Sequence, residues 1–390
     1  MKKIATSNQI IVLLLVMFFG LLIFLEQVIA PTDRMSMLLV CLRMGSIFAL
    51  LAVSMNLLNG FTGLFSLGHA GFMLIGAVTY AIFTIPLYQR YSVYRYYDYV
   101  VKISFPEVLG EIFGGPGMIL GVFIAIILAG LVTALIAFLV GLPVLRLKSD
   151  YLAIATLGFA EIIRAVFMWG GMGPITNAAN PLRLFTRQGD FAVTIGGYRF
   201  GLATFTIAVL SAICIFVVVL IVKSSYGRAF KAIREDEIAA EAMGINLFKH
   251  KQLAFCISSF FTGTGGALLA IFMGTVSAIN FRAGMTYEFL LIVVLGGIGS
   301  ISGSVVGAML FVFASQWWLR GLDSGVFLGI SSPLFRSGFR LVVFSVIIMC
   351  VVLFFRRGLL GDKELPYYAA KVKEKLFGSK SKPEAGESGV

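Results

Sequence analysis

Nine apolar stretches divide this chain, and most of them are long enough to cross a lipid bilayer. A membrane-spanning helix needs about 20 mainly apolar residues, because the bilayer core is about 30 Å thick and a helix rises about 1.5 Å per residue. Hydrophobic residues make up 59% of the sequence and charged residues only 13%, where a soluble domain carries about 25% charged residues. The predicted fold class is therefore all-α, a polytopic transmembrane helical bundle.

Seven of these stretches read as continuous spans, and glycines interrupt the other two. The continuous stretches cover residues 10–30, 38–58, 117–140, 151–169, 204–222, 253–273 and 339–355. The interrupted ones cover residues 61–85 and 287–319. If the second of these forms two short passes split at 296–303, the chain makes about ten membrane passes.

The basic residues predict how the chain is oriented. The formal net charge is +12, but the basic side chains gather at helix ends and in particular loops, as the positive-inside rule describes. They are dense in residues 223–251 and in the tail after residue 355, and Lys2 and Lys3 stand at the start. We therefore expect both termini and the 223–251 segment in the cytoplasm, an even number of passes, contact with membrane lipids and no nucleic-acid partner.

Domain organisation follows the same pattern. Residues 1–360 are predicted to form one transmembrane domain that contains 223–251 as a cytoplasmic segment, and residues 361–390 a disordered basic tail, because that tail is polar and of low complexity. On the outer side we expect a tyrosine-rich loop at 86–116, typical of a membrane interface, and a loop at 170–201.

The 223–251 segment reads KSSYGRAFKAIREDEIAAEAMGINLFKHK. It predicts a short helix rich in Arg, Glu and Ala outside the bilayer, ended at Gly244 by a left-handed cap. Two interpretations are open. Another protein can grip this helix, as a transporter without its own motor requires, or the segment is a solvated connector held by Arg–Glu pairs.

Polar side chains gather at the first glycine-rich break. Glycines inside a bilayer either let helices pack closely or break a helix so that backbone groups line a solute path. The residues clustered here are Asn56, Asn59, Thr62, Ser66 and His69, and both interpretations stay open for them. The second break lies at a matching distance from the other end of the chain, which suggests two related halves.

Few ionisable residues lie within the apolar stretches, where they need partners. Glu161 and Arg164 are three residues apart on one predicted helix and are interpreted as a structural ion pair facing the bundle interior, with a direct contact to the substrate as the alternative. Arg43 and Glu288 have no partner nearby in sequence. No metal-binding spacing and no catalytic motif such as HExxH, GxSxG or CxxC is present, so transport is favoured over catalysis.

Four sequence blocks resemble the M-type permease subunit of bacterial ATP-binding-cassette importers for branched-chain amino acids. They are SMNLLNGFTGLFSLGHAGFMLIGA (54–77), LPVLRLKSDYLAIATLGFAEIIR (142–164), GRAFKAIREDEIAAEAMGIN (227–246) and LIVVLGGIGSISGSVVGA (291–308). The resemblance implies a bacterial inner-membrane complex of this chain with a homologous second permease, two cytoplasmic ATPases and a periplasmic or lipid-anchored solute-binding protein. It also implies that ATP and Mg²⁺ bind the ATPases and that this chain binds no cofactor or metal.

The resemblance assigns roles to particular residues. The ATPase-coupling helix would comprise Arg234, Glu235, Glu237, Ala240, Glu241 and Gly244. The solute pathway would comprise the five polar residues of the first break together with Thr176 and Asn177.

One departure from the family pattern leaves the solute open. Relatives usually carry a Thr-Gly-Gly segment ending in Asn-Gly, where residues 176–181 read TNAANP. Urea, short amides or another small polar solute are alternatives to branched-chain amino acids. An ion-coupled secondary transporter is the alternative of a different class, although such a carrier has no need of a coupling helix; a membrane enzyme is a more distant one.

Overall fold

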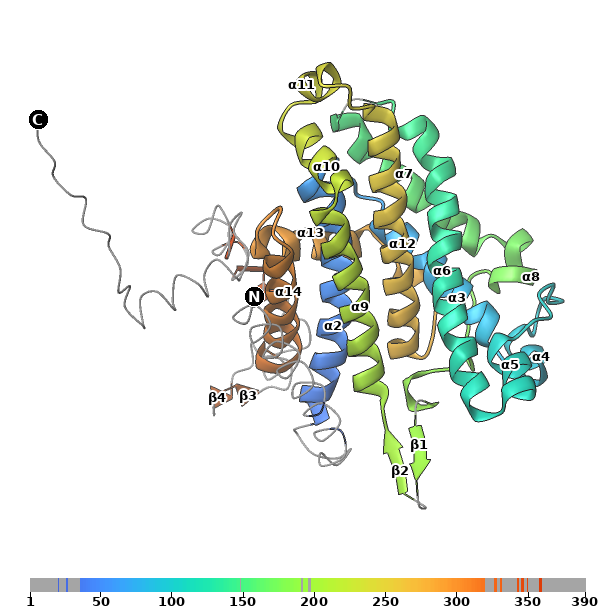
Figure 1. Cartoon of the computed structure of the whole chain (residues 1–390). Coiled ribbons are helices and arrows are strands. Elements are labelled where there is room, and N and C mark those ends of the chain that lie inside the picture. The colour runs from blue at the N-terminus through green and yellow to red at the C-terminus, as the bar shows by residue number, and fades with distance from the viewer. Residues whose placement is uncertain are drawn as a thin grey trace, which may run out of the picture.

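The computed structural model describes residues 20, 26, 36–147, 149–190, 192–195, 198–319, 326–327, 330–331, 342–343, 345–346, 349 and 358–359. Most of the predicted first span at 10–30, most of the predicted last span at 339–355 and the whole tail at 361–390 lie outside these residues. Within the described part, helices dominate and the all-α bundle is confirmed (Figure 1).

Eight of the ten predicted passes fall on described helices. Six are long and apolar enough to cross a membrane, and two more are shorter. The long ones are α2 (Ser36–Asn56) continued by η1 (Leu57–Phe61), α6 (Gly115–Val144), α7 (Ser149–Met168), α9 (Ala203–Lys223), α12 (Leu247–Met273), and α14 (Ile301–Val312) continued by η5 (Phe313–Trp318). The shorter ones are α3 (His69–Thr84) and α13 (Ala283–Gly296).

Both glycine-rich stretches break where the sequence predicts. After α2 the chain forms the π-helical turn η1, runs without helix from 62 to 68, and starts α3 at His69. The second stretch stops α13 at Gly296 and restarts as α14 at Ile301. With 16 and 14 residues, α3 and α13 rise only about 20–25 Å at about 1.5 Å per residue, less than the thickness of a bilayer core.

The core of the bundle surrounds α12, which packs against α2, α3 and α6. In its membrane window 78% of α12 is buried. Glycine permits the closest approach: a Cβ added at Gly76 of α3 would collide with the backbone of Gly263 of α12. The short α5 (Phe105–Phe113) approaches α6 in the same way, because a Cβ at Gly121 would lie 2.6 Å from the Phe105 carbonyl.

Short elements connect the long helices, and one hairpin among them lies at the end of the bundle opposite the charged segment (Figure 1). They are α4 (Leu87–Val93), α5, η2 (Gly170–Met172), α8 (Gly173–Thr176), η3 (Gln188–Asp190), η4 (Ala278–Asn280) and the hairpin of β1 (Ala192–Ile195) and β2 (Tyr198–Gly201), in which Ala192 pairs antiparallel with Gly201. A second, two-residue hairpin joins β3 (Val326–Phe327) and β4 (Ile330–Ser331). These hairpins lie in connecting segments, so the bundle remains helical.

A buried arginine organises the tyrosine-rich loop. The Arg90 side chain is almost fully buried and donates to the backbone carbonyls of Ile82 (2.9 Å), Ile85 (3.3 Å), Ile103 (2.6 Å) and Val101. These bonds tie the loop to the end of α3, and burial lowers the pKa of Arg90. The Tyr94 hydroxyl donates to the Ile175 carbonyl at 2.8 Å, and burial raises the pKa of Tyr94 to about 12.

The charged segment forms two helices at the other end of the bundle, α10 (Ser225–Glu235) and α11 (Glu237–Ala242) (Figure 1). One face of α10 is apolar: Phe230 and Ile233 are buried against the bundle. The six-residue α11 projects furthest, joined to α12 by the turn at 243–246. The fold therefore presents a short helix beyond the bundle, on a base that packs against the spans.

Candidate functional site

Asn56, at the end of α2, joins the two broken helices. Its side-chain amide donates to the Ser300 carbonyl at 2.9 Å and to the Ser304 hydroxyl at 2.8 Å. Its Oδ1 accepts from the Gly299 backbone N–H at 2.9 Å. The side chain is fully buried, so these bonds satisfy an amide for which water is not an alternative partner. The first break is thus bonded to the second, about 240 residues away.

Arg234 brings the charged segment onto both breaks. Its Nη1 donates to the Gly60 carbonyl at 2.9 Å, while Nη2 pairs with the carboxylate of Glu235 at 2.5 Å. A Cβ added at Gly63 would lie 3.0 Å from Arg234 Cγ, and one at Gly299 would lie 2.9 Å from Nη1. Both glycines have positive φ angles, 73° and 86°, so glycine serves here for conformation and for space.

A second basic residue of α10 contacts the first break. The Lys231 ammonium lies 5.5 Å from the centroid of the Phe61 ring, within the range of a cation–π interaction. Lys231 and Arg234 are three residues apart and so lie on one face of α10. Both residues are exposed, yet their side chains reach back to the first break, which the sequence alone did not indicate.

Both ends of α11 are capped. Asp236 Oδ1 accepts from the N–H groups of Ile238 (2.8 Å) and Ala239 (3.0 Å), as an N-cap aspartate does. At the other end Gly244 has φ 84°, so the predicted left-handed cap is confirmed. The Gly244 N–H donates to the Glu241 carbonyl at 2.9 Å, and the Ile245 N–H donates to the Ala240 carbonyl at 3.1 Å. These are the two hydrogen bonds of a Schellman motif.

The Asp236 cap was absent from the sequence analysis, although an aspartate directly before the helical run is the usual signal for one. Glu237 makes an ion pair with Lys251 at the start of α12, at 2.6 Å. With both caps and this pair, α11 is held in one conformation although most of it is exposed.

A further set of polar residues surrounds the start of α3, where His69 is 3% exposed. The Leu67 N–H donates to Thr156 of α7 and the Ala70 N–H to Thr286 of α13, both at 3.0 Å. Ser66 N–H bonds to Asn59 Oδ1 at 3.2 Å, and Thr62 caps η1 through the Leu57 carbonyl at 3.0 Å. Among the described residues, neither ring nitrogen of His69 has a hydrogen-bond partner.

Thr176 and Asn177 lie elsewhere, beside the tyrosine-rich loop. The Thr176 hydroxyl donates to the Phe167 carbonyl at 2.9 Å, and the Asn177 amide donates to the Val93 carbonyl at 3.1 Å. Asn177 and Ala178 have φ angles of 62° and 50°, a conformation that glycine adopts more easily. The predicted pathway residues thus form two groups, and no described contact joins these two residues to Asn56 or His69.

The predicted ion pair on α7 forms, but its surroundings differ from the expectation. Arg164 Nη2 lies 2.7 Å from Glu161 Oε2, and the two side chains are 27% and 40% exposed. Within this chain the pair therefore does not face the bundle interior, because no helix of the described part covers that side of α7.

Arg43 finds partners that are remote in sequence. It bonds to Glu26 (3.0 Å), Thr204 (2.6 Å) and Gln188 (3.1 Å), and Glu26 also accepts from the Thr204 N–H that begins α9. This network ties α2 to the start of α9 at the end of the bundle away from α11.

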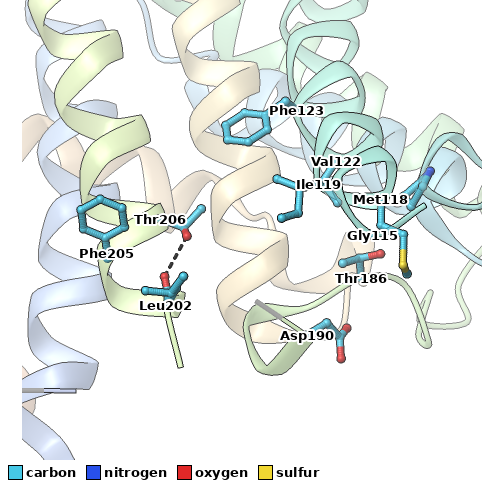
Figure 2. A pocket seen from close by; sticks show the side chains of 11 residues that line it. Gly115, Met118, Ile119, Val122, Phe123, Thr186, Asp190, Leu202, Phe205 and Thr206 are labelled. Carbon is cyan, nitrogen blue, oxygen red and sulfur yellow. Dashed lines mark hydrogen bonds between the residues drawn. The ribbon is translucent and has the colours of Figure 1, made fainter. Parts of the chain in front are cut away.

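A pocket of about 380 Å³ lies between α6 and α9, away from the breaks. Figure 2 shows Met118, Ile119, Val122 and Phe123 of α6 facing it, with Thr206 of α9 bonded to the Leu202 carbonyl at 2.7 Å and Asp190 near one end. None of the predicted pathway residues lines it. The pocket is thus a feature separate from the site at the breaks.

These features define the class of protein: a multi-pass helical membrane protein with two broken helices held by a charged extramembrane segment. A family described as "Branched-chain amino acid transport system / permease component" matches residues 37–355. The chain belongs to this family.

Three relatives illustrate the similarity. The high-affinity branched-chain amino acid transport system permease protein LivM of Salmonella typhimurium is 33% identical over 293 residues, 70% of this chain and 61% of that protein. A probable LivM of Methanocaldococcus jannaschii is 22% identical over 349 residues, 88% of this chain and 98% of that protein. The permease protein LivH of S. typhimurium is 34% identical over 143 residues, 36% of this chain and 42% of that protein.

The chain spans about three fifths of the length of the LivM proteins of S. typhimurium and Escherichia coli. No solved structure matches it.

Proposed function

We propose that this chain is the membrane permease subunit of an ATP-driven importer for branched-chain or related small amino acids. The family and the printed names of the relatives support this reading. The observation that carries it is the position of Arg234, in the charged segment, which bonds to Gly60 of one break and lies beside Gly299 of the other. A motion imposed on that segment would reach both broken helices.

The segment presents a surface for an ATPase. Ile238 on α11 and Met243 directly after it are 82% and 83% exposed. Exposure of apolar side chains to water is unfavourable, so these two residues would be stabilised by burial against another protein. Such residues at the tip of a capped helix are suited to a groove on a second protein. We assign Glu235, Glu237, Ala240 and Glu241 to this coupling unit with Gly244, and ATP and Mg²⁺ to the partner ATPases; the chain itself binds no cofactor and catalyses no reaction.

Arg234 then acts on the membrane side of the unit. When ATP closes the ATPase dimer, displacement of α11 would move α10, and with it the carbonyl of Gly60 and the turn at Gly299. Broken helices move more readily than continuous ones, because their halves are not joined by helical hydrogen bonds. Rocking of the two breaks would expose the pathway alternately to the two sides of the membrane.

We place the solute near Asn59, Ser66 and His69 as it passes. A buried imidazole without a partner is costly, and both nitrogens of His69 are in that position among the described residues. A polar group of a passing amino acid would relieve that cost. Thr176 and Asn177 stand at the opposite end, where the solute would enter from a periplasmic or lipid-anchored binding protein.

This assignment implies an orientation. The protein would lie in the bacterial inner membrane with α10 and α11 in the cytoplasm and the β1–β2 hairpin outside. Both termini would be cytoplasmic, in accord with the basic residues near each of them.

Purification of the tagged chain from its native membranes in a mild detergent tests the proposal. We expect two ATPase subunits and a homologous permease to co-purify, with uptake lost when the chain is deleted. Recovery of intact chain alone, still supporting uptake, would instead indicate a carrier that works by itself.

A further inference from the structure

Among the described residues, helix α7 has fewer neighbours than its composition demands. Its membrane window has the same mean hydropathy as that of α12, yet 22% of it is buried, against 78% for α12. The windows of α6 and α9 are also mostly exposed, with 39% and 28% of each buried, but both helices are much more apolar than α7. A helix of moderate hydropathy belongs inside a bundle, whereas strongly apolar helices can face lipid.

Charged side chains distinguish α7 and α13 from α6 and α9. Glu161 and Arg164 are partly exposed on α7, and Glu288 is exposed on α13, with no ion pair to any described residue. The exposed side chains along the middle of α6 and α9 are instead apolar: Ile124, Ile127, Leu131 and Leu135 on α6, and Ile213, Phe216 and Leu220 on α9. Ionisable side chains in contact with hydrocarbon are costly, so lipid does not cover α7 and α13 in this way.

The charged positions lie at one depth, on adjoining helices. Ala70 at the start of α3 donates to Thr286 of α13, and a Cβ added at the next residue, Gly71, would lie 3.0 Å from the Cβ of Ala160. Glu161 directly follows Ala160, and Glu288 lies two residues after Thr286. Because α7 also packs against α13, these carboxylates lie on adjoining helices at about the level of His69.

We propose that this α7–α13 face, marked by Glu161, Ile162, Arg164, Tyr287 and Glu288, is the surface on which a second, homologous permease chain packs within the membrane. The inference rests on the proposed function and adds to it the surface of this chain that contacts the second permease. Burial against a protein removes these charges from lipid, and the partner would offer a basic or hydrogen-bond-donating group to Glu288.

A distinct second permease suits this face better than a second copy of the chain. A two-fold copy would bring the same unpaired carboxylate to the interface. The chain is also similar to both LivM and LivH of S. typhimurium, two permease proteins that are named for one transport system. The start of α3 would then lie next to the boundary between the two permeases.

Site-specific photo-cross-linking in the intact complex tests this. The cross-linker replaces Ile162 or Tyr287, which are 56% and 47% exposed, and in matched controls Leu135 or Phe216, both 61% exposed. We expect adducts with the second permease from Ile162 and Tyr287, and lipid adducts alone from the two controls. Equal membrane levels of the four variants confirm that insertion is unchanged.

Lipid adducts alone at Ile162 and Tyr287, in a complex that still contains the second permease and the ATPases, would overturn the inference and leave the proposed function standing. Cross-links between two copies of this chain would overturn the choice of partner. Membranes in which no second permease accompanies the chain would contradict both proposals.

Discussion

Asn56 is the single residue on which the joining of the two breaks depends most. Its amide makes three hydrogen bonds, to the Ser300 carbonyl, the Ser304 hydroxyl and the Gly299 N–H. An asparagine in an apolar run signals a polar role from sequence alone. Its partners could not be predicted, because they lie in another broken helix about 240 residues away and only the fold brings them together.

Replacing Asn56 by alanine should destabilise the protein by about 2–3 kcal/mol, since a buried donor left without its partner costs about 1–3 kcal/mol. Thermal unfolding in detergent measures the change. Asn59→Ala is the control, because its bonds to Ser66 are longer, at 3.2 and 3.5 Å, and should cost less than about 1 kcal/mol. Equal effects of the two substitutions would contradict the assignment.

Gly244 is needed for its conformation and not for space. Its φ is 84° and nothing lies within 4 Å of an added Cβ, so alanine there should cost about 1–2 kcal/mol through backbone strain alone. We expect Gly244→Ala to lower uptake severalfold at unchanged membrane levels. Asparagine adopts this conformation more readily, and Gly244→Asn should retain more uptake than the alanine variant; the reverse order would show that the cap is not what matters.

At the scale of elements, α10 is the connection between the exposed α11 and the membrane helices. The sequence identifies α10 and α11 as a charged helical segment and places the breaks near residues 61 and 297. It does not reveal that Arg234 reaches the breaks, because a periodic pattern gives a residue's face but not the neighbour of that face. The structure supplies that neighbour in Gly60 and Gly299.

Arg234→Gln should therefore separate ATP hydrolysis from uptake. Loss of the guanidinium contact with Gly60 would reduce uptake by about tenfold or more, the scale of a typical coupling between sites, while the ATPases keep hydrolysing. The matched control is Arg228→Gln, because among the described residues the Arg228 side chain bonds only to the nearby Ser225, at 3.0 Å. Both activities are measured on the complex in vesicles; normal uptake by the Arg234 variant would exclude this role.

Helix α7 shows where reasoning from one chain stops. The spacing of Glu161 and Arg164 predicts their pairing, which the structure confirms at 2.7 Å. The expected burial of the pair does not hold in the isolated chain, since burial depends on what lies next to a helix. Spacing along one helix carries no information about a neighbour supplied by another protein.

At the scale of the molecule, apolar length and glycine-rich breaks predict the eight described passes. The arrangement of those passes required the structure, as did the network of Arg43 with Glu26, Thr204 and Gln188. Side chains that are distant in sequence meet there because helix ends gather at one membrane face. The roles of the predicted pathway and coupling residues stay predictions until variants are measured.

The pocket between α6 and α9 should not affect transport, because none of the predicted pathway residues lines it. Ile119 is 46% exposed on its wall, and tryptophan there would fill part of the space. We expect Ile119→Trp to leave the rate of uptake and its half-saturating concentration unchanged. A marked loss of uptake at equal membrane levels would place the pathway between α6 and α9.

Uptake by the purified complex in sealed vesicles is the most direct test of the central claim. With the binding protein outside and ATP enclosed on the α11 side, we predict accumulation of a labelled branched-chain amino acid that stops when ATP is omitted and persists when ion gradients are dissipated. Accumulation that needs an ion gradient and not ATP would contradict the account and indicate a secondary transporter.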